Sequence, residues 1–215
     1  MTLGGRLLCA LLIWTGAAPA VAATGGVSPC EGSDSAITLF NAGRQDAAYP
    51  LLSQLADRGC SEPVVYLYLG AYERGHGRRD RAVETFRRGL SHNAANVQLL
   101  LELAVTYSWT NRLSEARAVY QMALRLDPRS TPARLGEARV AGWMGRRDEA
   151  VAGFEAVLAE QPDNTEALAG LAAVHLAALR VDAARTYYRR VLALDPTSAD
   201  ARAGLLRADA VRRSE

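Results

Sequence analysis

The sequence predicts an all-α chain, an α-solenoid of stacked helix–turn–helix units that ends in a capping helix. Three features recur at a spacing of 34 residues. Pro128, Pro162 and Pro196 each follow an amphipathic helical pattern, an alanine recurs in five successive units, and a large apolar side chain follows each alanine by four residues. A fixed period of this length is typical of repeat proteins, in which each unit buries its apolar face against the next.

The composition is that of a globular chain. Of 215 residues, 25 are basic and 23 acidic, which gives a formal charge of +2, and 49% are hydrophobic. This hydrophobic content excludes a disordered chain. The near-neutral balance argues against nucleic acid or anionic lipid as the main partner, because binding to either requires a surplus of basic residues.

The period sets the domain layout. We expect a secretory signal peptide over residues 1–22, a linker over 23–34 and the solenoid over 35–215. The solenoid consists of a degenerate unit 29–62, four complete units 63–96, 97–130, 131–164 and 165–198, and a capping helix 199–215.

The first segment has the order of a secretory signal. Arg6 precedes an apolar run over residues 7–14, and small residues follow Pro19 up to Ala22. We therefore expect cleavage after Ala22 and an exported, periplasmic chain with no membrane span in its mature form. The alternative is an uncleaved N-terminal segment that associates with the membrane, although Pro19 interrupts the apolar stretch.

Cys30 and Cys60 are the two cysteines that remain after signal removal. They lie at the start of the first helix and just after the second helix of unit 29–62, and antiparallel packing brings these two points together. In an oxidising compartment we expect a disulfide that closes a loop of about 30 residues. The alternative is two buried thiols. We expect no metal site, because no histidine or further cysteine lies nearby in the sequence.

Each unit carries the same residues where its two helices meet. The small residue that lets the helices approach is Ala48, Ala82, Ala116, Ala150 and Ala184 in turn, and the large one is Leu52, Phe86, Tyr120, Phe154 and Tyr188. At the turn stand Gly43, Gly77, Asn111 and Gly145, which accept the left-handed backbone of a helix C-cap. Leu179 replaces them in the last complete unit and predicts a different turn there. Residues from 199 onward repeat the first-helix pattern with a polar outer side, which predicts the capping helix.

These motifs resemble the tetratricopeptide repeat family. The resemblance rests on Leu69-Gly70, on Leu103-Ala104 with Tyr107, and on the turns at 113–116 and 145–150, and it extends from residue 35 to about 212. It implies a right-handed solenoid whose first helices line a concave groove that holds a peptide or a partner protein. The family members that bind a C-terminal carboxylate do so with Lys and Asn side chains. This chain has no Lys, which argues against that mode of binding.

The strings at 107–112 and 141–146 also resemble the repeats that precede the barrel of bacterial exopolysaccharide export proteins, although no barrel follows here. This looser resemblance implies polysaccharide as another partner.

If the first helices line the groove, positions 2, 5, 9, 12 and 13 of each unit face it. The candidate partner-binding residues at these positions are Arg74, Leu101, Val105, Trp109, Leu135, Arg139 and Trp143. Trp109 and Trp143 are equivalent in adjacent units, and we expect them to form an aromatic ladder that anchors a partner. The alternative is that each tryptophan only covers its inter-helix turn. Arg139 is the candidate partner of a ligand carboxylate.

No catalytic, cofactor or metal motif is present, and the three histidines are scattered. The sequence therefore predicts a non-enzymatic periplasmic scaffold that binds a protein or peptide in its groove. The alternative function is a glycan-binding adaptor in exopolysaccharide or cell-envelope export.

Overall fold

The computed structural model describes residues 28–213, and this part of the chain is all-helical. The helices are α1 Ser33–Asn41, α2 Gln45–Asp57, α3 Pro63–Gly75, α4 Arg79–His92, α5 Val97–Trp109, α6 Leu113–Leu126, α7 Thr131–Trp143, α8 Arg147–Glu160, α9 Thr165–Ala177, α10 Val181–Leu194 and α11 Ala199–Arg213. The signal peptide expected over 1–22 and residues 23–27 of the expected linker lie outside the described residues.

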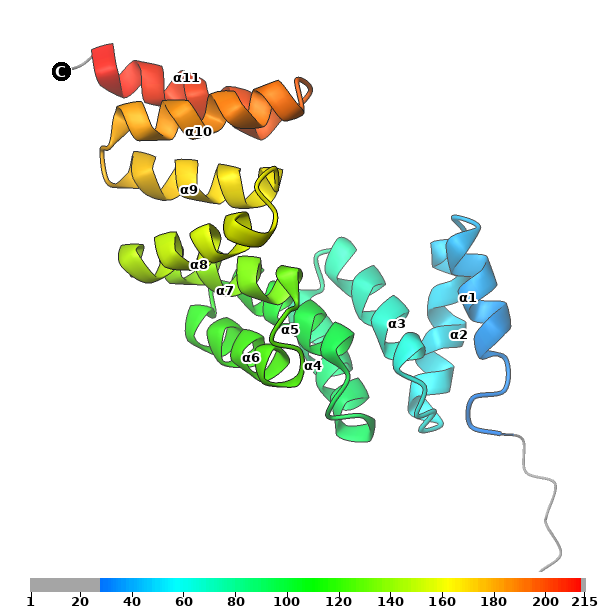
Figure 1. Ribbon diagram of the computed structural model, residues 1–215. Coiled ribbons are helices and arrows are strands. Elements are labelled where there is room, and N and C mark those ends of the chain that lie inside the picture. Colours follow the sequence, from blue (N-terminus) through cyan, green and yellow to red (C-terminus); the bar gives the residue numbers. More distant parts are fainter. Residues whose placement is uncertain (1–27, 214–215) are drawn as a thin grey trace, which may run out of the picture.

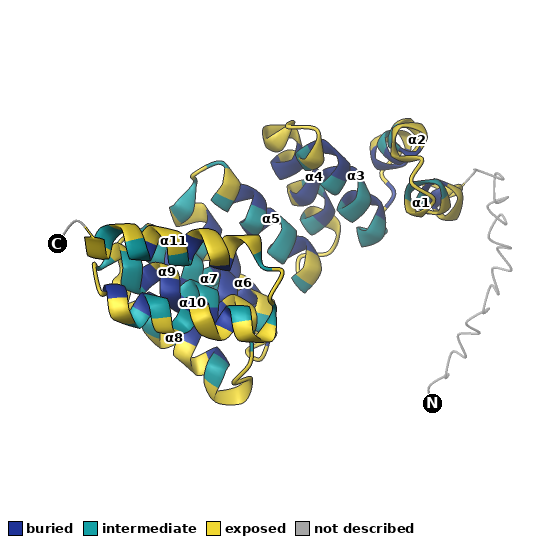
Figure 2. Ribbon diagram, turned by 90° about the horizontal axis from the view of Figure 1, so that it is seen from above, coloured by how far each residue is buried: buried dark blue, intermediate teal, exposed yellow. Residues whose placement is uncertain are grey.

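The helices form antiparallel pairs that follow one another along a curved row, an α-solenoid with α11 as its capping helix (Figure 1). Each helix packs against the next one in sequence. The backbones of the first helices of the pairs, α1, α3, α5, α7, α9 and α11, also approach one another in order, whereas within the described residues second helices meet only through long side chains, such as Arg117 of α6 and Glu149 of α8. The first helices therefore lie on the inner, concave side of the curve. Buried residues gather where neighbouring helices face each other (Figure 2).

The turn inside each pair uses one left-handed residue. Its φ is 77° at Gly43, 76° at Gly77, 58° at Asn111 and 76° at Gly145. Leu179 has φ 58°, so the expectation of a different turn in the last complete unit is wrong. The neighbouring repeats hold this turn in one geometry, and the leucine adopts it at a steric cost that glycine does not incur.

The large apolar residue of each second helix fills the space between repeats. Tyr120, Phe154 and Tyr188 are buried. Their rings lie against glycines at the sixth position of the next unit, so that a Cβ atom would come within 2.2 Å of Tyr120 at Gly136, within 2.4 Å of Phe154 at Gly170 and within 2.3 Å of Tyr188 at Gly204. Glycine lets the ring of one repeat reach the backbone of the next.

Phe86 breaks this pattern. The sixth position of the following unit is Glu102, and the Phe86 ring packs instead on Gly70 of its own repeat, where a Cβ would lie 2.4 Å away. The Glu102 carboxylate is 2.5 Å from the Arg74 guanidinium, whose centre lies 5.9 Å from the Phe86 ring centroid. At this boundary a glutamate that pairs with Arg74 therefore stands at the position where the later boundaries have glycine.

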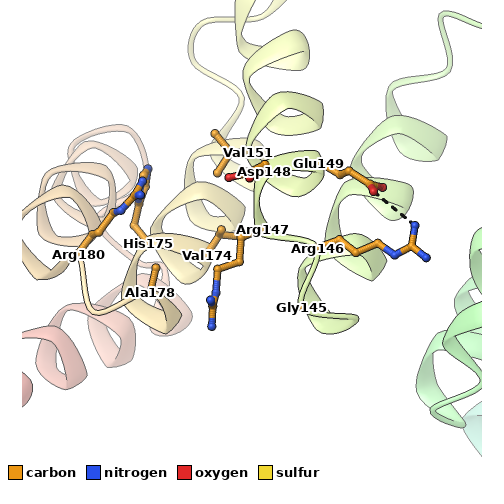
Figure 3. A pocket seen from close by; sticks show the side chains of 10 residues that line it. All are labelled: Gly145, Arg146, Arg147, Asp148, Glu149, Val151, Val174, His175, Ala178 and Arg180. Carbon is orange, nitrogen blue, oxygen red and sulfur yellow. Dashed lines mark hydrogen bonds and ion pairs between the residues drawn. The ribbon is translucent and has the colours of Figure 1, made fainter.

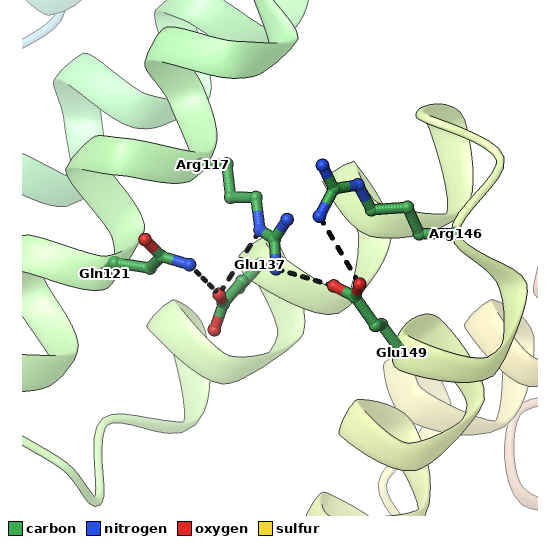
Figure 4. Close-up of polar contacts among 5 residues, drawn as sticks. All are labelled: Arg117, Gln121, Glu137, Arg146 and Glu149. Carbon is green, nitrogen blue, oxygen red and sulfur yellow. Dashed lines mark hydrogen bonds and ion pairs between the residues drawn. The ribbon is translucent and has the colours of Figure 1, made fainter.

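Polar contacts among α6, α7 and α8 link the middle repeats. Arg117 of α6 lies 3.7 Å from Glu137 of α7 and 2.5 Å from Glu149 of α8, and Gln121 donates to Glu137 at 2.8 Å (Figure 4). Arg146 also reaches Glu149, at 3.4 Å. Glu149 accepts from two arginines, and Glu137 accepts from Gln121 and forms an ion pair with Arg117, so this network links α6, α7 and α8.

A disulfide joins Cys30 to Cys60, as expected, and closes the N-terminal unit. It fixes α1, which contributes Phe40 to the inner side; the Phe40 ring lies edge-on to Tyr68 of α3 at 4.7 Å. At the other end, Arg185 of α10 pairs with Asp209 of α11 at 2.7 Å. Over residues 28–213 no helix combines the length and the apolar character that a bilayer span requires.

Candidate binding groove

The inner side of the solenoid is hollowed by three adjoining depressions, of about 390, 720 and 610 Å³ from the N-terminal to the C-terminal end. Gln98 and Glu102 line both the first and the second depression, and Arg139 and Glu166 line both the second and the third. The three therefore form one continuous surface, which we call the groove. It runs from Phe40 of α1 to Asp200 of α11.

Apolar side chains from consecutive first helices form the floor of the groove. Leu67 lines the first depression, and Leu101, Val105 and Leu135 line the central one. Leu135 is only 3% exposed, so it supports the floor from below and offers little contact area of its own. Asn96 starts α5 locally, because its side chain accepts from the Leu99 amide at 2.9 Å and so directs the chain into the helix.

The third depression has a floor of smaller side chains. Ala169, Ala173 and Ala177 of α9 stand where the preceding unit has Leu135, Arg139 and Trp143. The wall opposite is Trp143, which is 54% exposed. Beside Trp143 the groove is therefore lined by alanines on the α9 side, where the central depression has larger side chains.

The two tryptophans lie in different environments. Trp109 is 57% exposed but does not line any of the three depressions, and the Arg74 guanidinium covers its ring at 5.4 Å. Within the described residues no ring contact joins Trp109 to Trp143, so the expected aromatic ladder is not formed as a stack. Arg74 also lies outside the depressions and bonds to Thr106 Oγ1 at 3.3 Å.

The charges of the groove are mostly paired with each other. Arg139, expected to bind a ligand carboxylate, forms an ion pair with Glu166, and Arg74 is paired with Glu102. Asp200 has no ion pair among residues 28–213. Although the whole chain carries a formal charge of +2, the lining of the groove contains three carboxylates and one guanidinium. A carboxylate that binds Arg139 must therefore compete with Glu166 or share the guanidinium with it.

Glu102 is a charged groove residue that lies outside the positions predicted from the sequence. The positions assigned to the groove did not include the sixth of each unit, yet Tyr68, Glu102, Gly136 and Gly170 at that position all line it. The recurrence of glycine at 136, 170 and 204, with glutamate one period earlier, is the signal that marks this position.

The lining of the three depressions includes no histidine, cysteine or serine. Burial raises the pKa of the Tyr120 phenol, which lines the central depression, and it therefore stays protonated. In the described part of the chain, the one group of three metal-ligand atoms consists of Cys30, Cys60 and Glu62, whose sulfurs are bonded to each other and not to a metal. The chemistry that the groove offers is recognition by apolar contact and charge.

The family comparison agrees with this fold. The Tetratricopeptide repeat model matches residues 74–140 and 144–210, and the chain belongs to that family. No curated protein matches the chain.

Solved structures of tetratricopeptide repeat proteins share the architecture. One from Parabacteroides merdae superposes with a TM-score of 0.75 at 17% identity, covering 87% of this chain and 74% of its own. The protein TTC0263 of Thermus thermophilus gives 0.67 at 24% identity, with coverage of 84% and 98%. YrrB, described as having an unusual peptide-binding site, gives 0.65 at 18% identity, with coverage of 78% and 87%. At these identities the likeness is one of fold.

Proposed function

We propose that the chain is an exported, non-enzymatic scaffold that binds a segment of a partner protein in the groove. The observation that carries the proposal is the continuity of the groove, because three depressions with shared lining residues extend along the first helices from α1 to α11. A surface of this length suits an extended or helical segment better than a small molecule. Its stacked helices are preformed, which lowers the entropy cost of binding.

Membership of the tetratricopeptide repeat family supports a protein partner, since such folds serve as interaction scaffolds. The peptide-binding site named for YrrB, a protein of similar fold, points the same way. In this chain the anchoring residues are Leu101 and Val105 in the central depression and Trp143 beside the third. Trp143 stays exposed in the free protein, whereas Leu101 and Val105 are partly buried, and large accessible apolar side chains are the usual centres of protein interfaces.

Two features support an exported, periplasmic location. The N-terminal segment has the order of a secretory signal, although it lies outside the described residues. The Cys30–Cys60 disulfide persists in an oxidising compartment and is rare in a reducing one. Fusion of residues 1–30 to a reporter enzyme that is active only after export tests this, and a reporter retained inside the cell would contradict it.

Affinity capture from an envelope extract tests the function. The bait is the exported chain, compared with a Trp109→Ala, Trp143→Ala variant and with a Met122→Ala variant, which changes an exposed residue of α6 that lines none of the depressions. We expect the wild-type chain to capture a protein partner and the tryptophan variant to retain at least tenfold less of it. If polysaccharide is captured and no protein, the proposed partner class is wrong, and if both variants retain the partner equally, the proposed site is wrong.

A further inference from the structure

A second cavity lies outside the groove, where the turns of two adjacent repeats meet. It has a volume of about 550 Å³. On one side stand the turn before α8 and the first residues of that helix, and on the other the end of α9 with the turn that follows it (Figure 3). We call it the turn pocket. Its apolar base is formed by Val151 and Val174, and Val174 is the one residue that it shares with the third depression of the groove.

The turn pocket holds cations that the protein itself leaves unpaired. Of the three arginines that line it, Arg146 is paired with Glu149, which is also held by Arg117. Neither Arg147 nor Arg180 has an ion pair or side-chain hydrogen bond among residues 28–213. Asp148 is the one lining acid without an ion pair there. Two guanidiniums against one carboxylate leave a local surplus of positive charge beside an apolar base.

Exposed apolar side chains border this pocket in sequence. Leu179 directly follows the lining residue Ala178, and Trp143 precedes the lining residue Gly145 by two positions. Leu179 is 67% exposed although its backbone is left-handed, a conformation that glycine or asparagine supplies at the same turn of the earlier repeats. A strained, exposed leucine has little packing to compensate its strain, and such outliers gather at binding sites.

We propose that the turn pocket binds an acidic, apolar peptide segment of a partner protein, with its carboxylates paired with Arg147 and with Arg180 and an apolar side chain on Leu179. Guanidinium groups donate pairs of hydrogen bonds to a carboxylate, and apolar surface beside them adds area that water leaves on binding. This site is separate from the groove, and a protein partner can occupy either one alone.

His175 supplies an internal reporter. Its ring stacks on Tyr187 at 5.6 Å, and burial together with the charge of Arg180 lowers its pKa, while Glu155 opposes the shift. A carboxylate bound to Arg180 offsets the positive charge that His175 feels. Occupation of the pocket therefore raises the pKa of His175, and a peptide bound in the groove leaves it unchanged.

Selection from a random heptapeptide phage library on the exported chain tests the proposal. We expect enriched peptides in which Asp or Glu stands next to an aromatic or aliphatic residue. Binding of a synthetic copy should weaken at least tenfold in the Arg147→Gln, Arg180→Gln variant. It should be unchanged in Arg125→Gln, Arg129→Gln, which removes the same charge from exposed positions near the end of α6. The peptide should also raise the pKa of His175, measured by NMR, and its Asn or Gln analogue should not.

A groove variant separates this site from the proposed function. Ala173→Arg places a long side chain in the third depression of the groove and does not touch the turn pocket. Peptides that depend on Arg147 and Arg180 and still bind Ala173→Arg support the turn pocket. If the selected peptides no longer bind Ala173→Arg but bind Arg147→Gln, Arg180→Gln as well as they bind the wild type, the turn pocket is not their site. That result would overturn the turn-pocket proposal and would support the groove. Selection that enriches no acidic peptide also overturns the turn-pocket proposal.

Discussion

Tyr120 lies against the backbone of Gly136, across the boundary between two repeats, so closely that a Cβ atom at Gly136 would come within 2.2 Å of the Tyr120 ring. The same relationship joins Phe154 to Gly170 and Tyr188 to Gly204. At each of these three boundaries one ring is therefore seated on a glycine, and the spacing between the first helices there depends on that contact. Because those helices form the groove, their spacing sets its shape.

Gly136→Ala tests this seat. The added methyl group must displace a buried ring, and overpacking of this kind costs about 1 to 3 kcal/mol. Gly142→Ala is the matched control on the same helix, because its Cβ would meet its nearest neighbour at 3.4 Å, an ordinary contact. Urea unfolding should show a clear loss for the first variant and little change for the second. Equal midpoints would contradict the proposed role of Gly136.

Leu179→Gly is expected to stabilise the chain. A left-handed backbone costs a side-chain-bearing residue about 1 to 2 kcal/mol, and the larger unfolded-state entropy of glycine offsets about 0.4 to 1 kcal/mol of the relief. The net gain is therefore between about 0 and 1.6 kcal/mol, seen as a higher melting temperature. Ala178→Gly is the control; its φ is −91°, and that variant should lose stability. A Leu179→Gly variant that melts below the wild type would show that the leucine contributes packing energy at this turn.

Loss of the disulfide should destabilise the N-terminal unit selectively. Closing a loop with a sequence separation of 30 is worth about 3 to 4 kcal/mol in the chain-entropy account. In the Cys30→Ala, Cys60→Ala variant we expect hydrogen exchange to speed up in α1 and α2 and to stay slow in α7 to α10, because repeats couple mainly to their neighbours. Reductant should reproduce this in the wild type and have no effect on the variant. Peptides bearing Cys30 and Cys60 that separate on proteolysis without reductant would contradict the pairing.

Glu73 makes stability depend on pH. It is buried on α3, and burial raises the pKa of its carboxyl group, while the hydrogen bond donated by Thr85 at 2.6 Å and the charges of Arg81 and Arg78 oppose the rise. The folded state therefore binds this proton more tightly than the unfolded state does. The stability that Glu73 contributes is fully present below about pH 4.5, the ordinary pKa of a glutamate side chain. It is lost as the pH rises through the higher pKa of the folded state.

Glu73→Gln removes that loss, because glutamine keeps an acceptor for Thr85 and cannot ionise. The stability of the variant relative to the wild type should therefore increase with pH from about 4.5 upward, as measured by urea unfolding from pH 4 to pH 8. The exposed Glu84 on the next helix provides the control, and Glu84→Gln should show no such trend. A parallel pH profile for Glu73→Gln and the wild type would contradict the account.

The sequence was sufficient to predict the repeat frame, because each recurring residue answers a local steric demand. An alanine is required where two helices cross, and all five at this position are fully buried. Gly145 is required at the left-handed turn. The Cys30–Cys60 pair followed from antiparallel packing in one unit. These contacts lie within one helix pair, so the sequence of that pair is enough to predict them.

Contacts between repeats were harder to predict. The Arg139–Glu166 ion pair depends on how far α9 shifts along α7, and no feature of either helix alone encodes that shift. Phe86 packs on Gly70 of its own repeat, unlike Tyr120, Phe154 and Tyr188, although the alanine and the large side chain four residues later recur in all four units. Leu179 kept the turn of its neighbours because the repeats on both sides fix the geometry, which overrides the preference of the residue itself.

The central claim, that a protein partner lies in the groove, is tested most directly by site-specific photocrosslinking of the chain. A photoreactive phenylalanine analogue replaces Ala173, an exposed residue of the third depression at the position equivalent to Arg139, so the fold accepts a long side chain there. The same analogue at Ala152, an exposed residue of α8 that lines none of the depressions, is the control. We predict a protein adduct from position 173 and none from position 152. An adduct from position 152 with none from 173 would contradict the claim.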